Sequence, residues 1–69
     1  MQIKAIMAGN VWKVLVKPGD TVESGQDVVI LESMKMEIPI TAEAGGTVKA
    51  VHVNEGDFAN EEDVLVELE

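Results

Sequence analysis

The chain contains no cysteine and no arginine, and Trp12 and Phe58 are its only aromatic residues. Without thiols it can form neither a disulfide nor a thiolate metal site. Its five basic residues are scattered lysines, and 13 acidic residues give it a formal net charge of −8. A nucleic-acid-binding protein needs a basic stripe that displaces phosphate counterions, and an anionic membrane surface would repel this chain. The sequence therefore argues against nucleic acid and membranes as partners.

Long apolar runs are also missing. No segment approaches the roughly 20 residues needed to span a bilayer, and the N-terminus, Met1–Lys4, lacks the pattern of a signal peptide. We therefore expect a cytoplasmic protein. Its 69 residues, 46% of them hydrophobic, suffice for one small domain spanning residues 1–69. Valine, isoleucine and leucine dominate the apolar residues, which favours strands over helices.

The sequence repeats itself at a spacing of 37 residues. Residues 3–32 match residues 40–69 at 11 of 30 positions without a gap. Such a repeat predicts one supersecondary unit that occurs twice. Two copies favour a closed pair over a solenoid, since a solenoid usually needs three or more. We therefore expect two halves, related by a pseudo-two-fold rotation and joined by residues 33–39.

Each copy has the pattern of short strands separated by turns. Residues 11–16 and 48–53 carry valines at alternating positions, Val14 and Val16 in one copy and Val51 and Val53 in the other, and residues 28–31 and 64–68 are mostly apolar. Gly-Asp pairs and other polar residues separate these segments, as turns require. Sustained helical spacing is absent. The sequence thus predicts an all-β domain of about eight short strands, arranged as two sheets or a flattened barrel.

The connection between the two copies has an unusual composition. A tight hairpin tip would ordinarily carry Gly, Asn or Asp, whereas here Lys35 stands between Met34 and Met36. In one interpretation the methionines merely cap the open end of the core and Lys35 is solvated. In the other interpretation, the two methionines, which are flexible and polarisable, flank a lysine that meets partner proteins. The repeat places this connection at one end of the molecule and both chain termini at the other.

The segment Glu32-Ser33-Met34-Lys35-Met36 closely resembles the Glu-Ala-Met-Lys-Met signature of biotinyl domains, with Ser33 in place of alanine. The resemblance covers nearly the whole chain, although Glu61-Glu62 stands where the second half of such domains often has a glycine. It implies a flattened sandwich of two four-stranded antiparallel sheets with quasi-two-fold symmetry. Three further segments are similar to the family pattern: 7–11, 16–26 and 53–59.

In that family the lysine at the position of Lys35 is the site of covalent biotin. The resemblance assigns the flanking Met34 and Met36 to recognition and places Glu32 and Ser33 in the motif. It implies biotin protein ligase, biotin carboxylase and carboxyltransferase as partners. The ligase would attach biotin, and the biotinyl arm would carry carboxylate between the other two active sites. The domain would be a carrier, with no catalytic residue and no metal site of its own.

Two other functions stay open at this point. A lipoyl carrier of an oxo-acid dehydrogenase shares the fold and the lysine, although it typically shows Asp-Lys-Ala, and Glu32 provides the acid that often precedes its lysine. Lipoate, lipoate ligase and dual modification are therefore alternatives. A non-carrier adaptor of the same fold would not need Lys35 between two methionines. His52, the single histidine, is a weak candidate for a metal ligand, and Trp12 is expected to pack in the core or against a hairpin.

Overall fold

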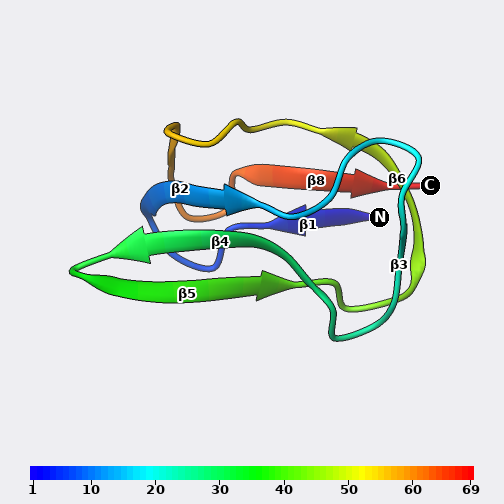
Figure 1. Ribbon diagram of the computed structural model, residues 1–69, viewed down its shortest axis with the longest axis horizontal. Coiled ribbons are helices and arrows are strands. Elements are labelled where there is room, and N and C mark those ends of the chain that lie inside the picture. Colours follow the sequence, from blue (N-terminus) through cyan, green and yellow to red (C-terminus); the bar gives the residue numbers. More distant parts are fainter.

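The computed structural model describes all residues 1–69 and contains eight strands and no helix (Figure 1). Four strands form a sheet in the order β1-β8-β6-β3, and the other four form a sheet in the order β5-β4-β2-β7, with every pairing antiparallel. The predicted all-β sandwich is therefore confirmed. No helix capable of crossing a membrane is present. The strands are β1 (Gln2–Lys4), β2 (Gly9–Val14), β3 (Thr21–Val22), β4 (Asp27–Ser33), β5 (Met36–Thr41), β6 (Gly46–Val51), β7 (Phe58–Ala59) and β8 (Val64–Leu68).

The strand pairings repeat at the spacing seen in the sequence. The pair Val11↔Leu31 becomes Val48↔Leu68 when 37 is added to each residue number. The register of β1 on β8 likewise matches that of β5 on β4. Each sheet takes two strands from each half, so the halves interlock and neither can complete a four-stranded sheet alone. Folding of one half therefore depends on the other.

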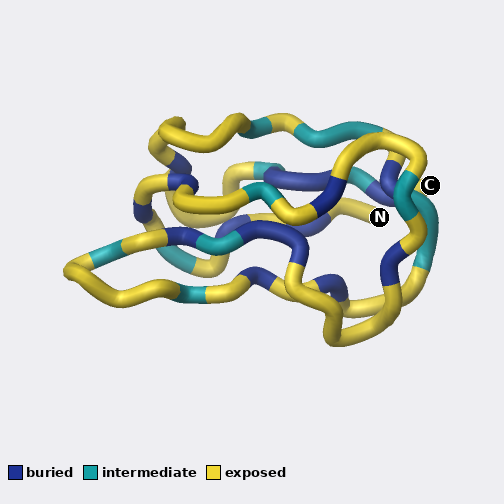
Figure 2. The backbone as a smooth tube through the Cα atoms, viewed as in Figure 1, coloured by how far each residue is buried: buried dark blue, intermediate teal, exposed yellow.

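The core lies between the two sheets and is entirely apolar (Figure 2). Strand β4, which is paired on both sides, contributes Val28, Val29 and Leu31, all with 0% exposure. Burying a side chain of this size stabilises a fold by about 1.5–3 kcal/mol. The other buried apolar residues are Ile3, Ala5, Val11, Val16, Val22, Ile40, Ala42, Val48, Ala59, Leu65, Val66 and Leu68.

Trp12 lies on the surface, so the expectation that it packs in the core is wrong. Its strand β2 contains an irregularity between Val11 and Lys13, and β6 has the equivalent irregularity between Val48 and Ala50. Trp12 follows the buried Val11 and so faces outward by strand alternation, and the bulge keeps the next residue, Lys13, on the outer face as well. Trp12 is 42% exposed, and the Nζ of Lys13 lies 5.5 Å from the centre of its ring. This cation–π contact contributes about 0.5–1 kcal/mol at an exposed site.

The Gly-Asp pairs form the same turn in both halves. Gly19 has φ 94° and Gly56 has φ 97°, as expected for turn glycines. Oδ2 of Asp20 accepts the backbone N–H of Lys17 at 3.0 Å, and Oδ2 of Asp57 accepts that of Asn54 at 2.8 Å. Each carboxylate therefore closes its turn by accepting a hydrogen bond from the backbone three residues earlier.

The turn between β7 and β8 departs from the symmetry in one residue. Glu62 has φ 76° where the equivalent Gly25 has φ 86°. A residue with a Cβ costs roughly 1–2 kcal/mol in this left-handed region, whereas glycine adopts it readily. No hydrogen bond or ion pair of the Glu62 side chain offsets this cost.

We therefore expect Glu62→Gly to raise the free energy of unfolding by about 0.5–1 kcal/mol, since part of the relieved strain is offset by the flexibility of glycine in the unfolded chain. Urea denaturation measures the change. Glu62→Ala is the control, because it removes the charge and keeps the Cβ. An equal gain from Glu62→Ala would assign the effect to charge and contradict the backbone explanation.

Candidate functional site

The hairpin of β4 and β5 projects from the sandwich at the end opposite both chain termini (Figure 1). Ser33 pairs with Met36, so the loop contains two residues, Met34 and Lys35. We call these two residues the tip turn. The remaining residues of the predicted 33–39 connection belong to the strands on either side. The connection that the sequence places at residues 33–39 is therefore the end of a paired and rigid hairpin.

Both residues of the tip turn have left-handed backbones, with φ 52° at Met34 and φ 65° at Lys35. Positive φ at both central positions is typical of a type I′ turn, which natural hairpins usually build from Asn-Gly. Two side-chain-bearing residues here cost roughly 1–2 kcal/mol each. Strain of this kind concentrates at functional sites. Met34 and Lys35 are therefore not the residues that would stabilise this turn best. Their presence indicates that the turn is suited to presenting their side chains.

The tip turn and its neighbour are highly exposed. Met34 is 92% exposed and Met36 64%, and Lys35 is also exposed. The ion pairs of the molecule join Lys49 and His52 to Glu67, so the amine of Lys35 has no ion-pair partner. The site therefore offers a primary amine to an incoming enzyme, between two apolar side chains.

The two residues before the tip turn face opposite sides of the hairpin. Glu32 is exposed and lies opposite Glu37 on β5, which gives the hairpin an acidic outer face. Ser33 is half-buried and points to the same side as the buried Leu31. The five residues of the sequence motif therefore do not form one surface, and those of the tip turn and its neighbour Met36 are all exposed.

The base of the hairpin is fixed by a close approach between two strands. A Cβ on Gly9 would lie 2.8 Å from the backbone carbonyl oxygen of Glu32. At the equivalent Gly46 the nearest atom would be Cδ1 of Leu68 at 3.6 Å, an ordinary contact. Of these two equivalent glycines, only Gly9 makes such a tight approach, beneath the tip turn where β2 supports β4.

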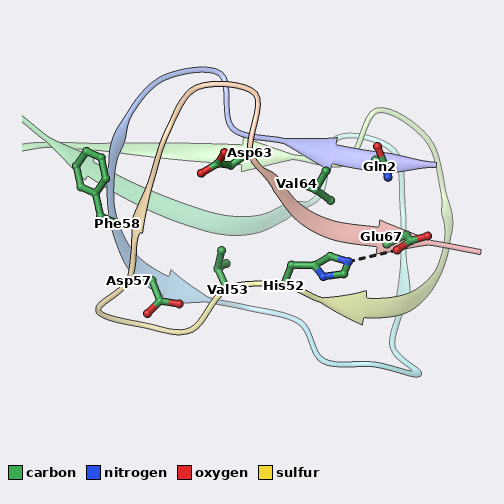
Figure 3. A pocket seen from close by; sticks show the side chains of 8 residues that line it. All are labelled: Gln2, His52, Val53, Asp57, Phe58, Asp63, Val64 and Glu67. Carbon is green, nitrogen blue, oxygen red and sulfur yellow. Dashed lines mark hydrogen bonds and ion pairs between the residues drawn. The ribbon is translucent and has the colours of Figure 1, made fainter.

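His52 lies away from the tip hairpin, and its environment is that of a surface residue. Its Nε2 is 3.2 Å from Oε1 of Glu67, whose other oxygen lies 3.8 Å from Nζ of Lys49. His52 and Glu67 border an open hollow of about 620 Å³ beside β8 (Figure 3). No cluster of three or more His, Cys, Asp or Glu side chains is arranged to hold a metal ion.

Comparison with known proteins agrees with this geometry. A family model described as biotin-requiring enzyme matches residues 1–68. The biotin/lipoyl attachment protein of Bacillus subtilis (strain 168) is 63% identical over 68 residues, which cover 99% of this chain and 93% of that protein. The mitochondrial propionyl-CoA carboxylase alpha chain of Homo sapiens is 49% identical over 67 residues, which cover 97% of this chain and 9% of that one.

Among solved structures, the urea carboxylase of Kluyveromyces lactis superposes with a TM-score of 0.89 at 30% identity, over 96% of this chain and 6% of that chain. The chain thus matches nearly the whole of one small relative and a minor part of two large carboxylases. Its fold is the one that these relatives share. The chain belongs to the biotin/lipoyl family of biotin-requiring enzymes.

Proposed function

We propose that residues 1–69 form one carrier domain that holds biotin through an amide bond to Nζ of Lys35. The observation that carries the proposal is the position of this amine, at the outermost turn of a rigid hairpin and without an ion-pair partner. The Met-Lys-Met sequence and similarity to domains of carboxylases support it. The domain is a substrate for other enzymes and no catalyst itself.

Loading requires a biotin protein ligase that activates the biotin carboxyl group with ATP as an acyl-adenylate. Nζ of Lys35, once deprotonated, attacks the acyl carbon, the new C–N bond forms, and AMP leaves. Because activation resides in the adenylate, this chain contributes presentation: it holds the amine clear of the sheets and keeps its surroundings open. When bound, biotin supplies a ureido nitrogen that carries carboxylate.

The shape of the domain suits transfer between two active sites. The arm leaves from one end of a body whose longest dimension is 31 Å. A tethered group searches at a high effective concentration, so a biotin carboxylase and a carboxyltransferase can use the same arm in turn. The apolar and flexible side chains of Met34 and Met36 are then suited to a surface that contacts more than one partner.

A lipoyl or dual carrier is the alternative. The observation that favours it is the exposed Glu32, three residues before Lys35, where lipoyl domains often have an acid. The lysine itself and its turn suit either acyl group. The paired methionines favour biotin, because lipoyl domains typically show Asp-Lys-Ala.

Purified apo-protein should gain one biotin when incubated with biotin protein ligase, biotin and ATP. Intact mass measures the gain, and trypsin locates it, because an amide at Lys35 blocks cleavage and leaves residues 14–49 as one peptide. A parallel reaction with lipoate ligase and lipoate is the comparison. Biotin on Lys13 or Lys49 would contradict the assignment, and lipoate alone on Lys35 would transfer the function to the alternative.

A further inference from the structure

Four exposed residues form a row across one sheet just before the tip turn. Phe58 on β7 pairs with Asn10 on β2, Asn10 pairs with Glu32 on β4, and Glu32 pairs with Glu37 on β5. Residues paired in this way point to the same face, and all four are exposed. We call them the tip row. Two strand spacings of about 4.8 Å separate Phe58 from Glu32, so Phe58 lies near the base of the tip hairpin.

The fold does not require an aromatic residue at position 58. Phe58 is 60% exposed, while its neighbour Ala59 is buried. Thr21 occupies the symmetry-equivalent position, and it pairs with Thr47 on β6 as Phe58 pairs with Asn10 on β2. The same backbone position therefore carries threonine at the end with the chain termini and an exposed phenylalanine at the end with Lys35. A large exposed apolar side chain at this end of the sheet, beside the hairpin that carries Lys35, indicates a surface for a partner.

The net negative charge of the molecule is concentrated in the half that contributes Phe58. Residues 1–37 contain four lysines and five acidic residues, whereas residues 38–69 contain one lysine and eight acidic residues. Phe58 borders the hollow beside β8, together with Asp57, Asp63 and Glu67 (Figure 3). At the equivalent positions on the other side stand Asp20, Gln26 and Ile30. The surface next to Phe58 therefore suits a positively charged partner.

We propose that Phe58 docks on biotin protein ligase, in an apolar pocket with a basic rim that faces the carboxylates around it. The inference rests on the proposed function. The ligase binds ATP and the biotin carboxylate, both anionic, so lysine or arginine must line the approach to its active site. It also meets this chain before biotin is present, so it must recognise the polypeptide itself.

We expect Phe58→Thr to raise the KM of the ligase for the apo-protein about fivefold or more, the usual effect of losing an aromatic anchor. The kcat should stay unchanged, because Lys35 and the tip turn are untouched. The swap variant Thr21→Phe/Phe58→Thr keeps the composition and moves the aromatic residue to the other end, and it should show the same raised KM. Thr21→Phe alone should behave as the wild type, and Phe58→Leu should fall between.

Ionic strength tests the charged rim. The KM of the wild type should rise as salt is added, since screening weakens attraction between exposed charges. Glu37→Gln, in the tip row, should raise the KM at low salt and reduce its dependence on salt. Glu43→Gln makes the same charge change in the loop between β5 and β6, outside the tip row, and should leave both unchanged.

An unchanged KM for Phe58→Thr, or an equal change for Thr21→Phe alone, would overturn the proposal. An equal dependence of KM on salt for Glu37→Gln and Glu43→Gln would contradict the proposed basic rim of the ligase pocket. Thermal unfolding of each variant confirms that it is folded, and Phe58→Leu still decides the matter if Phe58→Thr is unstable. A wild-type chain that takes no biotin at all would refute the proposed function. Normal loading, with the same KM whether the phenylalanine stands at position 58 or at position 21, would refute this inference alone.

Discussion

Lys35→Ala abolishes loading by biotin protein ligase and leaves the free energy of unfolding within about 0.5 kcal/mol of the wild type, the range usual for exposed positions. Its side chain is exposed and makes no ion pair, so its removal costs no contact. Lys35→Arg also fails, because a guanidinium stays protonated and is a poor nucleophile. Intact mass after incubation with ligase, biotin and ATP measures loading, and urea denaturation measures stability.

Two controls make the Lys35 result specific. Lys13→Ala and Lys49→Ala remove lysines on β2 and β6 and should load one biotin as the wild type does. Lys35→Gly should be inactive yet more stable than Lys35→Ala, because glycine relieves the left-handed backbone at φ 65°. Full loading of Lys35→Ala would end the assignment.

Gly9→Ala destabilises the domain by about 1–3 kcal/mol, the usual cost of overpacking. The new Cβ would meet the carbonyl oxygen of Glu32 at 2.8 Å, so β2 and β4 must separate beneath the tip turn. Gly46→Ala, at the equivalent place in the other half, meets no atom nearer than Cδ1 of Leu68 at 3.6 Å and should cost less than about 1 kcal/mol. Urea denaturation of the two variants gives the difference directly.

The Gly9 variant should also load biotin more slowly, because displacement of Glu32 moves the root of the hairpin that presents Lys35. Gly46→Ala serves as the control again, since it lies on β6 in the other sheet. Equal destabilisation by both alanines would mean that the close approach at Gly9 relaxes without strain, and the role given to β2 as a support would then be wrong.

Much of the fold could be predicted because the sequence states it twice. The spacing of 37 residues relates β2 to β6, β3 to β7 and β4 to β8 with identical lengths for the first two pairs. The Gly-Asp pairs gave the turns, and positive φ at both Gly19 and Gly56 confirms that expectation. The position of Lys35 at the end away from the termini followed from the same symmetry.

The features that sequence reasoning missed depend on register and not on composition. Trp12 follows the buried Val11 and faces outward by strand alternation, and the bulge after Val11 keeps Lys13 outward as well, which hydrophobicity alone does not indicate. Phe58 was visible only as part of a turn-containing segment, since the pairing that carries it to the tip row joins β7 to β2 across 48 residues of sequence. Comparison of the two copies was the available signal, because Phe58 stands at the position where the first copy has Thr21.

The chain termini meet at the end of the body farthest from Lys35. The N-terminal amine of Met1 donates to the carbonyl oxygen of Leu68 at 3.0 Å, and the N–H of Leu68 donates back to Met1 at 2.7 Å. Any polypeptide fused to either end would therefore pivot the domain about that point. The 31 Å body then acts as a stiff lever that adds its own length to the swing of the arm, so a short hinge would sweep a wide arc. For engineered fusions, reach is set by the orientation of the lever more than by the length of the linker.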